Sequence, residues 1–306
     1  MMKKLLTLMG VVLFAACIGC KVGNNREAQS ENAVDTAAVY DSIGHLRQAA
    51  VERPDDAGLY YAMGHAYDQV GDYTEAVACY QKVAELKPDF AGAYNNMGNA
   101  YDDLGNHAEA IACYRKAVET DPGYAEAYYN MGTVYEHSGD YAEAVACYQK
   151  AVEVNPDYAE AYYNMGTTYR RAEKFAQAVA CYQKAVEIRP GYVEAHYNMG
   201  TVFTFLENYT EALACFQKAV ELDPGLEDAY YNMGVVYAAE GKYAKAVACY
   251  QKAVKANPDF ADAYYNMGVA FFHLKKGRES VTNFRKAAQL GDEEAREWLG
   301  KNGYEW

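Results

Sequence analysis

The chain has 306 residues, of which 51% are hydrophobic and 23% are charged, and its formal net charge is −14. This acidic balance argues against nucleic acid and anionic lipid headgroups as bulk partners, because their phosphates would be repelled. It is compatible with basic partners and says nothing about the fold.

Residues 1–20, MMKKLLTLMGVVLFAACIGC, have the pattern of a secretory signal. A basic start precedes an apolar stretch of about 12–15 residues, which is shorter than the ~20 residues that a membrane span needs. The stretch ends in small residues and a cysteine, which resembles the lipobox of bacterial lipoproteins, where the cysteine is lipidated and becomes the mature N-terminus. We favour Cys20 as the lipidated residue, with Cys17 as the alternative. The remaining interpretation is an ordinary cleaved signal or an N-terminal membrane anchor.

Residues 21–32 (KVGNNREAQSEN) are polar and lack periodicity, which indicates a flexible tether. The resemblance therefore implies a protein of the bacterial cell envelope, anchored to a membrane by its lipid and facing the periplasm or the cell surface.

Residues 33–56 predict a single helix that ends at Arg53-Pro54. Ser42, Leu46 and Ala49 have the spacing found in the second helix of the repeats that follow. We expect this segment to be an N-terminal cap helix with one polar face.

Seven Met-Gly pairs come next with a fixed period of 34, which indicates structural units stacked in a line. The glycines are Gly64, Gly98, Gly132, Gly166, Gly200, Gly234 and Gly268.

Residues 125–158 illustrate the unit. Apolar and small residues recur at helical spacing before and after Gly139-Asp140, and Asn155-Pro156 ends the second stretch. Glycine suits the end of the first helix, and Asp140 suits the N-cap of the second. Each unit is therefore predicted to be two antiparallel helices, called helix A and helix B. Gly132 in helix A is expected to pack against the large aromatic residues, because a dense core sets large residues against small ones.

The pattern resembles the tetratricopeptide repeat. In the second full unit it reads Tyr94, Met97, Gly98, Tyr101, Ala110, Tyr114, Ala117 and Pro122. The resemblance covers seven units over residues 57–290 and implies an all-α solenoid, a right-handed superhelix of helix hairpins. Glu173, Glu207 and Lys275 replace the expected glycine between the two helices of their units. Residues 291–306 are expected to form a C-terminal cap helix with Trp298 and Leu299 turned inward.

Six further cysteines recur with the same period, from Cys79 to Cys249. Equivalent residues of stacked units are about one helix diameter, roughly 10 Å, apart, whereas a disulfide needs Cα atoms within ~7 Å. We therefore predict free thiols that act as small packing residues. A metal–thiolate store is disfavoured, since zinc ligands must converge on one ion.

The sequence contains no recognisable nucleophile–base pair, phosphate loop, metal-binding motif or dinucleotide fingerprint. We expect a protein that is not an enzyme, with no cofactor, no metal and no small-molecule substrate.

In the resembled family, the A helices line a concave groove in which peptides or partner segments bind. The fifth and sixth residues of each unit would line it, where tyrosine offers contact area and asparagine both a donor and an acceptor. The alternative is that both residues simply follow the repeat consensus. The candidate residues at these positions are Tyr129, Asn130, Tyr163, Asn164, Tyr197, Asn198 and Asn232.

The variable groove positions change from acidic to basic to apolar along the chain. Arg170 and Arg171 form the basic pair, and Phe205 and Phe272 belong to the apolar end. Clustered apolar residues on a surface mark interaction sites, although Phe272 could equally pack against the C-terminal helix.

Two functions remain open. The first is a membrane-anchored scaffold that binds a protein or peptide in its groove. The second is a structural or assembly accessory of an envelope complex, which acts through its convex face or by self-association.

Overall fold

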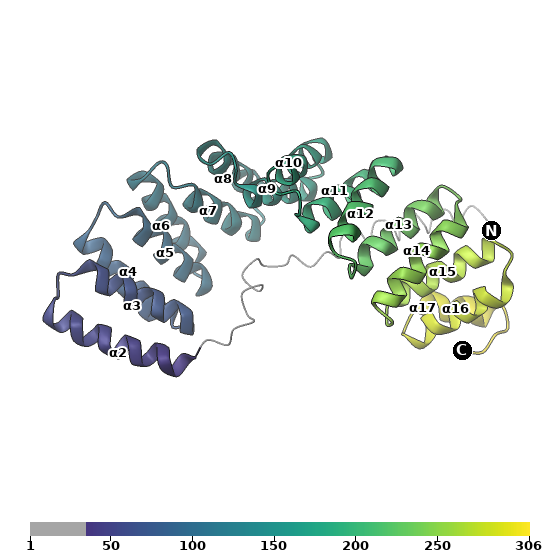
Figure 1. Ribbon diagram of the computed structural model, residues 1–306, viewed down its shortest axis with the longest axis horizontal. Coiled ribbons are helices and arrows are strands. Elements are labelled where there is room, and N and C mark those ends of the chain that lie inside the picture. Colours follow the sequence, from purple (N-terminus) through teal and green to yellow (C-terminus); the bar gives the residue numbers. More distant parts are fainter. Residues whose placement is uncertain (1–34) are drawn as a thin grey trace. The chain divides into compact units, whose positions relative to one another are not determined.

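A computed structural model describes residues 35–306 (Figure 1). In this range every regular element is an α-helix, and there are 16 of them. The expected signal of residues 1–20 and the expected tether of residues 21–32 lie outside the described residues. None of the helices in residues 35–306 is both long and apolar enough to cross a bilayer.

The helices in chain order are α2 (Thr36–Glu52), α3 (Ala57–Val70), α4 (Tyr73–Leu86), α5 (Ala91–Asp103), α6 (His107–Thr120), α7 (Ala125–His137), α8 (Tyr141–Val154), α9 (Ala159–Arg171), α10 (Phe175–Ile188), α11 (Val193–Phe205), α12 (Tyr209–Leu222), α13 (Glu227–Ala239), α14 (Tyr243–Ala256), α15 (Ala261–His273), α16 (Gly277–Gln289) and α17 (Glu293–Lys301).

The described chain divides between Lys174 and Phe175 into an N-terminal part, α2–α9, and a C-terminal part, α10–α17. Within each part, consecutive helices pack against one another (Figure 1). The odd-numbered helices α3–α15 are the A helices of the units, and the even-numbered helices α4–α16 are the B helices. The predicted all-α array of helix hairpins is confirmed.

The turn between helix A and helix B requires one residue in the left-handed backbone region. Four units use glycine there, with φ between 73° and 82° at Gly71, Gly105, Gly139 and Gly241. The three sequence departures keep the same geometry, since φ is 57° at Glu173 and 59° at Glu207 and Lys275. A residue with a Cβ is strained in this region by roughly 1–2 kcal/mol.

Asp140 lies at the N-cap of α8, but its side chain makes no capping hydrogen bond there. Side-chain caps are instead made by Asp35, Asp56 and Asp292, at the starts of α2, α3 and α17. The N-cap position expected for Asp140 is therefore confirmed, and this cap forms without a hydrogen bond from its side chain.

The repeated glycine of helix A allows the aromatic ring of helix B to lie directly against it. A Cβ on Gly234 would lie 2.4 Å from Cε1 of Tyr250, and one on Gly64 would lie 2.5 Å from the same atom of Tyr80. The corresponding distances for Gly98, Gly132, Gly200 and Gly268 are 2.6, 2.8, 2.8 and 2.9 Å. These distances are far below the ~3.5–4.0 Å of an ordinary carbon–carbon contact. The expected packing of large against small residues is therefore found in six hairpins.

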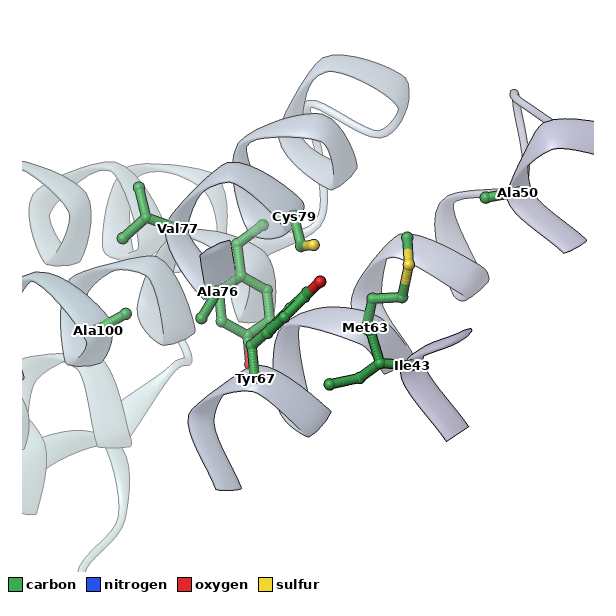
Figure 2. Packing of buried hydrophobic residues seen from close by; sticks show 9 residues of the cluster. Ile43, Ala50, Met63, Tyr67, Ala76, Val77, Cys79 and Ala100 are labelled. Atoms are coloured by element: carbon green, nitrogen blue, oxygen red, sulfur yellow. The ribbon is translucent and has the colours of Figure 1, made fainter. Parts of the chain in front are cut away.

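The core runs between successive hairpins of each part. At the N-terminal end, Ile43 and Ala50 of α2 meet Met63 and Tyr67 of α3, with Cys79 of α4 beside them (Figure 2). At the other end of the chain, Ala295 and Leu299 of α17 are fully buried against α16. In both places a single flanking helix covers the apolar side of the neighbouring hairpin.

The six repeated cysteines are free and buried. Burial raises the thiol pKa to about 11 at Cys113, Cys147 and Cys215, and to about 12 at Cys181. Because the thiolate is the reactive form, these side chains act as inert packing groups at neutral pH.

Candidate functional site on the helix A face

The expected partner-binding residues lie on the A helices. Positions are numbered from the first residue of each repeat unit. This residue is also the first residue of the odd-numbered helices α3 to α15. The helix A face is defined as positions 2, 5, 6, 9, 12 and 13 of these helices.

A hydrogen bond from position 6 to position 5 of the preceding unit connects neighbouring A helices. In the C-terminal part, Nδ2 of Asn232 donates to the hydroxyl of Tyr197 at 3.0 Å. In the N-terminal part, Asn164 donates to Tyr129 at 2.9 Å. The same bond is made by Asn96 to Tyr61 (3.0 Å) and by Asn266 to Tyr231 (2.8 Å). One amide N–H of each asparagine is therefore used inside the protein, and the amide and the phenol hold each other in place.

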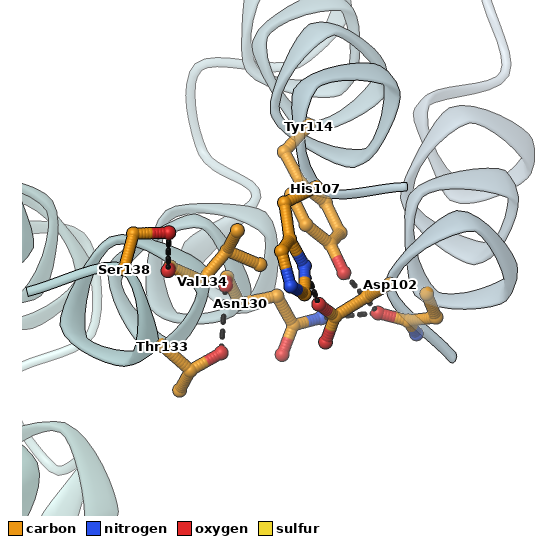
Figure 3. Close-up of polar contacts among 8 residues, drawn as sticks. Asp102, His107, Tyr114, Asn130, Thr133, Val134 and Ser138 are labelled. Carbon is orange, nitrogen blue, oxygen red and sulfur yellow. Dashed lines mark hydrogen bonds and ion pairs between the residues drawn. The ribbon is translucent and has the colours of Figure 1, made fainter. Parts of the chain in front are cut away.

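The second unit has an asparagine at position 5, and the network adapts to it. Asn130 donates through Nδ2 to Oδ1 of Asn95 at 3.1 Å and to Oδ1 of Asn99 at 3.0 Å. Asn99 also accepts from the hydroxyl of Tyr114 at 2.8 Å (Figure 3). A tyrosine hydroxyl of helix B thus reaches the helix A face and fixes a polar side chain there.

The predicted tyrosines and asparagines differ in how far a partner could reach them. Tyr197 is 8% exposed and Asn198 is 5% exposed, so both are buried. Half-buried side chains occur at the other candidate positions, which are Tyr129, Asn130, Tyr163, Asn164 and Asn232. The half-buried members of the set therefore keep part of their surface accessible to a partner.

The basic pair lies in the last turn of α9, where positive charge is favoured by the helix dipole. Arg171 is paired with the preceding unit, since its Nη1 lies 3.4 Å from Oε1 of Glu136. Glu136 is 8% exposed and also accepts a hydrogen bond from the hydroxyl of Tyr148 at 2.9 Å. The half-buried Arg170 precedes Arg171 on the same helix. The charge of Arg171 therefore partly neutralises a buried carboxylate of the protein.

Carboxylates of the first two units also contact polar groups of their own hairpins. Oδ2 of Asp68 accepts from the hydroxyl of Tyr80 at 2.5 Å, and burial together with this carboxylate raises the phenol pKa. Oδ1 of Asp102 lies 3.0 Å from Nδ1 of His107 (Figure 3). These contacts orient the acidic side chains along the helix A face.

The apolar end of the face lies in the C-terminal part. Phe205 is 48% exposed and Phe272 is 54% exposed, the two largest exposures among the phenylalanines of residues 35–306. The ring of Phe205 lies 4.4 Å from that of Phe175, and the ring of Phe272 meets Trp298 edge-on at 6.3 Å. Phe272 thus contacts the C-terminal helix and still presents half of its surface to solvent.

Trp298, which the sequence places on the inward side of the C-terminal cap helix, also belongs to this face, a role that the sequence did not indicate. Ala295, Leu299 and Gly300 of α17 have the same spacing as Ala263, Met267 and Gly268 of α15, so α17 is a shortened helix A. Trp298 takes the position that asparagine occupies in six other units. Its ring packs 4.3 Å from Phe284 and closes the apolar end of the face. In the sequence, Leu299-Gly300 corresponds to the Met-Gly pair of the other units and would have identified α17 as a helix A. The pair is easily missed because the distance from Gly268 to Gly300 is shorter than the repeat period.

No cluster of His, Cys, Asp or Glu within residues 35–306 has the arrangement of a metal site. The hydrogen-bonded groups of the helix A face pair with one another in ways that stabilise helix packing. What the arrangement offers chemically is a row of polar groups and exposed aromatic rings for binding.

Family models for the tetratricopeptide repeat match most of the repeated region. They cover residues 89–156, 123–191, 193–226 and 215–248, and a further TPR model covers residues 69–105 and 236–275. The chain belongs to the tetratricopeptide repeat family. The resemblance to the tetratricopeptide repeat that the Met-Gly period indicated is therefore confirmed.

Solved TPR structures align with large parts of the chain. The crystal structure of YrrB, described as a TPR protein with an unusual peptide-binding site, is 31% identical with a TM-score of 0.54, over 64% of this chain and 97% of that one. The crystal structure of MamA is 27% identical with a TM-score of 0.53, over 56% of this chain and 94% of that one. The C-terminal part of a TPR protein from Cytophaga hutchinsonii has a TM-score of 0.68 at 16% identity, over 78% and 99% of the two chains, and supports the fold alone. None of the curated proteins matches the chain.

Proposed function

We propose that this TPR protein is a membrane-anchored scaffold that binds an extended segment of a protein partner in a concave groove formed by its A helices. The observation that carries the proposal is the exposure of Phe205 and Phe272 on the helix A face, at 48% and 54%. Large aromatic rings that remain exposed in a folded protein mark interaction surfaces. The peptide-binding site of YrrB supports a binding role for this fold.

The polar rows would serve the same segment in a different way. Asn164, Asn232 and Asn266 each use one amide N–H in the bond to the preceding tyrosine, and an asparagine amide carries a second N–H and a carbonyl oxygen besides. Because its amide is already held in one orientation, little side-chain entropy is lost when a peptide backbone binds. Affinity would come from the exposed aromatic residues and orientation from the asparagines.

Site-specific photo-crosslinking in the producing cell tests the groove. A photoreactive phenylalanine in place of Phe205 or Phe272 should form a covalent adduct with the same partner protein. Leu222 is the matched control, since it is 37% exposed but lies at the end of helix B of its unit. Adducts of equal yield at Leu222 and Phe205, or no adduct at either phenylalanine, would refute the proposal.

We propose that the N-terminus carries a lipid on Cys20, with Cys17 as the alternative. The support is the basic, apolar and small-residue pattern of residues 1–20. Metabolic labelling with a fatty acid should mark the wild-type chain and Cys17→Ser, and should fail to mark Cys20→Ser. The opposite pattern assigns the lipid to Cys17, and labelling of neither wild type nor variant refutes lipidation.

An assembly role is the second candidate function. One structural observation favours its self-association form: each end of the described array presents a single helix rather than a hairpin. In this role the helix A face would be secondary to contacts between copies of the chain.

A further inference from the structure

The helix at the N-terminal end of the array is a helix B that lacks a helix A before it in the described residues. Residues 53–57, which follow α2, read RPDDA, and residues 87–91, which follow α4, read KPDFA. The two segments are one repeat period apart, so α2 has the register of α4. Leu46 therefore occupies position 24, which is the position of the aromatic ring packed on the helix A glycine.

No helix of residues 35–306 covers the side of α2 that a helix A would cover. Positions 20, 24 and 27 are completely buried in the next unit, where they are Ala76, Tyr80 and Val83. In α2 the same positions are Ser42, which is exposed, and Leu46 and Ala49, which are half-buried. The apolar stripe of this helix is therefore only partly covered.

The helix at the C-terminal end is the opposite half of a hairpin. α17 is a shortened helix A, and Gly300 is its position 8 glycine. A Cβ on Gly300 would meet no atom within 4 Å, whereas in six hairpins the same test finds a ring of helix B at 2.4–2.9 Å. The C-terminal tail turns back along α16, where Nε of Arg285 donates to the carbonyl of Glu305 at 2.7 Å, and leaves Gly300 uncovered.

We propose that α17 of one copy of the protein packs against α2 of a second copy, and that the two helices complete a hairpin with Leu46 seated on Gly300. The hairpins of both parts supply the template, because each of them joins the same two positions. The contact is heterologous, so one end of each copy stays available and the association can propagate head to tail. It is independent of whether the helix A face binds a peptide.

Two features predict that the contact is weak in solution. A single pair of helices lies at the small end of specific interfaces, and leucine fills less of the space over the glycine than tyrosine or phenylalanine does. A stronger contact is therefore expected from Leu46→Tyr, which restores the aromatic residue found at position 24 in the complete hairpins. High local concentration on a shared surface would have the same effect.

Photo-crosslinking of the full chain in its own cell tests the contact. Benzoylphenylalanine replaces Leu46 in one copy, and an isotope-labelled second copy carries either wild-type Gly300 or Gly300→Phe, which fills the open space over the glycine. We expect a covalent dimer in which residue 46 is linked to residues 293–301 of the labelled copy. Gly300→Phe should lower its yield about tenfold, in line with loss of a central interface contact. Gly300 is exposed, so the change there disturbs no buried core. Leu46 is half-buried and packs against the N-terminal core cluster.

Gly44 provides the control position on α2. It is exposed, and its equivalents in the complete units, such as Ala78, are exposed as well, so benzoylphenylalanine there should give no dimer. A dimer linked through α2 of both copies, an adduct within one copy, a yield that Gly300→Phe leaves unchanged, or no dimer at Leu46 would each overturn the proposal.

Discussion

Replacing Gly234 with alanine should destabilise the sixth hairpin although alanine is the better helix former. The new Cβ would lie 2.4, 2.6 and 2.9 Å from three ring carbons of Tyr250, and this ring is only 1% exposed. The helices must separate by about 1 Å to reach normal contact. Overpacking of this kind costs about 1–3 kcal/mol, and the helix propensity of alanine returns about 1 kcal/mol. The expected net loss is about 0–2 kcal/mol, and the very short contacts of 2.4–2.9 Å favour the upper end of this range.

Native-state hydrogen exchange measures this loss where it occurs, because long repeat arrays do not unfold in one cooperative step. The amides of α13 and α14 should lose protection in Gly234→Ala, while those of α3 and α4 keep theirs. Gly300→Ala is the matched control, since no atom lies within 4 Å of its Cβ, and it should be neutral or stabilising by up to about 1 kcal/mol. Unchanged protection in α13 and α14 would show that the close contact between Gly234 and the ring of Tyr250 does not determine the stability of this hairpin.

Three further predictions concern the turns and the thiols. Glu207→Gly should stabilise the fifth hairpin by about 0.5–1 kcal/mol, because glycine adopts the φ of 59° at this position without the strain that a Cβ causes. A fall in the urea midpoint of unfolding would contradict this. The thiol pKa of Cys113, Cys147 and Cys215 is raised from 9.0 to about 11, so their contribution to stability is complete below pH 9 and is lost as pH rises through about 11; urea midpoints that stay constant over this range would refute it. At neutral pH iodoacetamide should alkylate the six cysteines only after unfolding, and mass spectra showing rapid labelling of the folded chain would contradict their burial.

The regular features of the fold followed from the sequence because they are local or strictly periodic. The Met-Gly period placed the A helices, and the proline-containing turns placed the ends of the B helices. The packing of Tyr148 on Gly132 was also foreseen, since a glycine within a helix needs a large neighbour to justify its cost. Asp140 occupies the N-cap that the sequence predicts, but the sequence does not show whether its carboxylate bonds to the helix, and in the structure it makes no capping hydrogen bond.

The polar contacts of the helix A face could not be predicted with the same success. Arg171 reaches Glu136, and Asn232 reaches Tyr197, each across 35 residues. Helix periodicity describes one helix at a time, so it does not reveal which side chains of two stacked units face each other. The common offset of one unit plus one residue is the signal that would have found both contacts. Sequence patterning did identify Phe205 and Phe272 as apolar groups of this face, but not that both remain half exposed.

The asparagine–tyrosine bond has a consequence for how such a gene can change in length. Loss of residues 227–260 would remove one full period and bring Asn266 opposite Tyr197, and this is the same pair of side chains that Asn232 now forms with Tyr197 and Asn266 with Tyr231. Unequal crossing-over between the near-identical coding segments would therefore join compatible surfaces at the new junction. Shorter and longer versions of the protein can arise in single genetic events. In each of them the units at the new junction would form the same asparagine–tyrosine hydrogen bond.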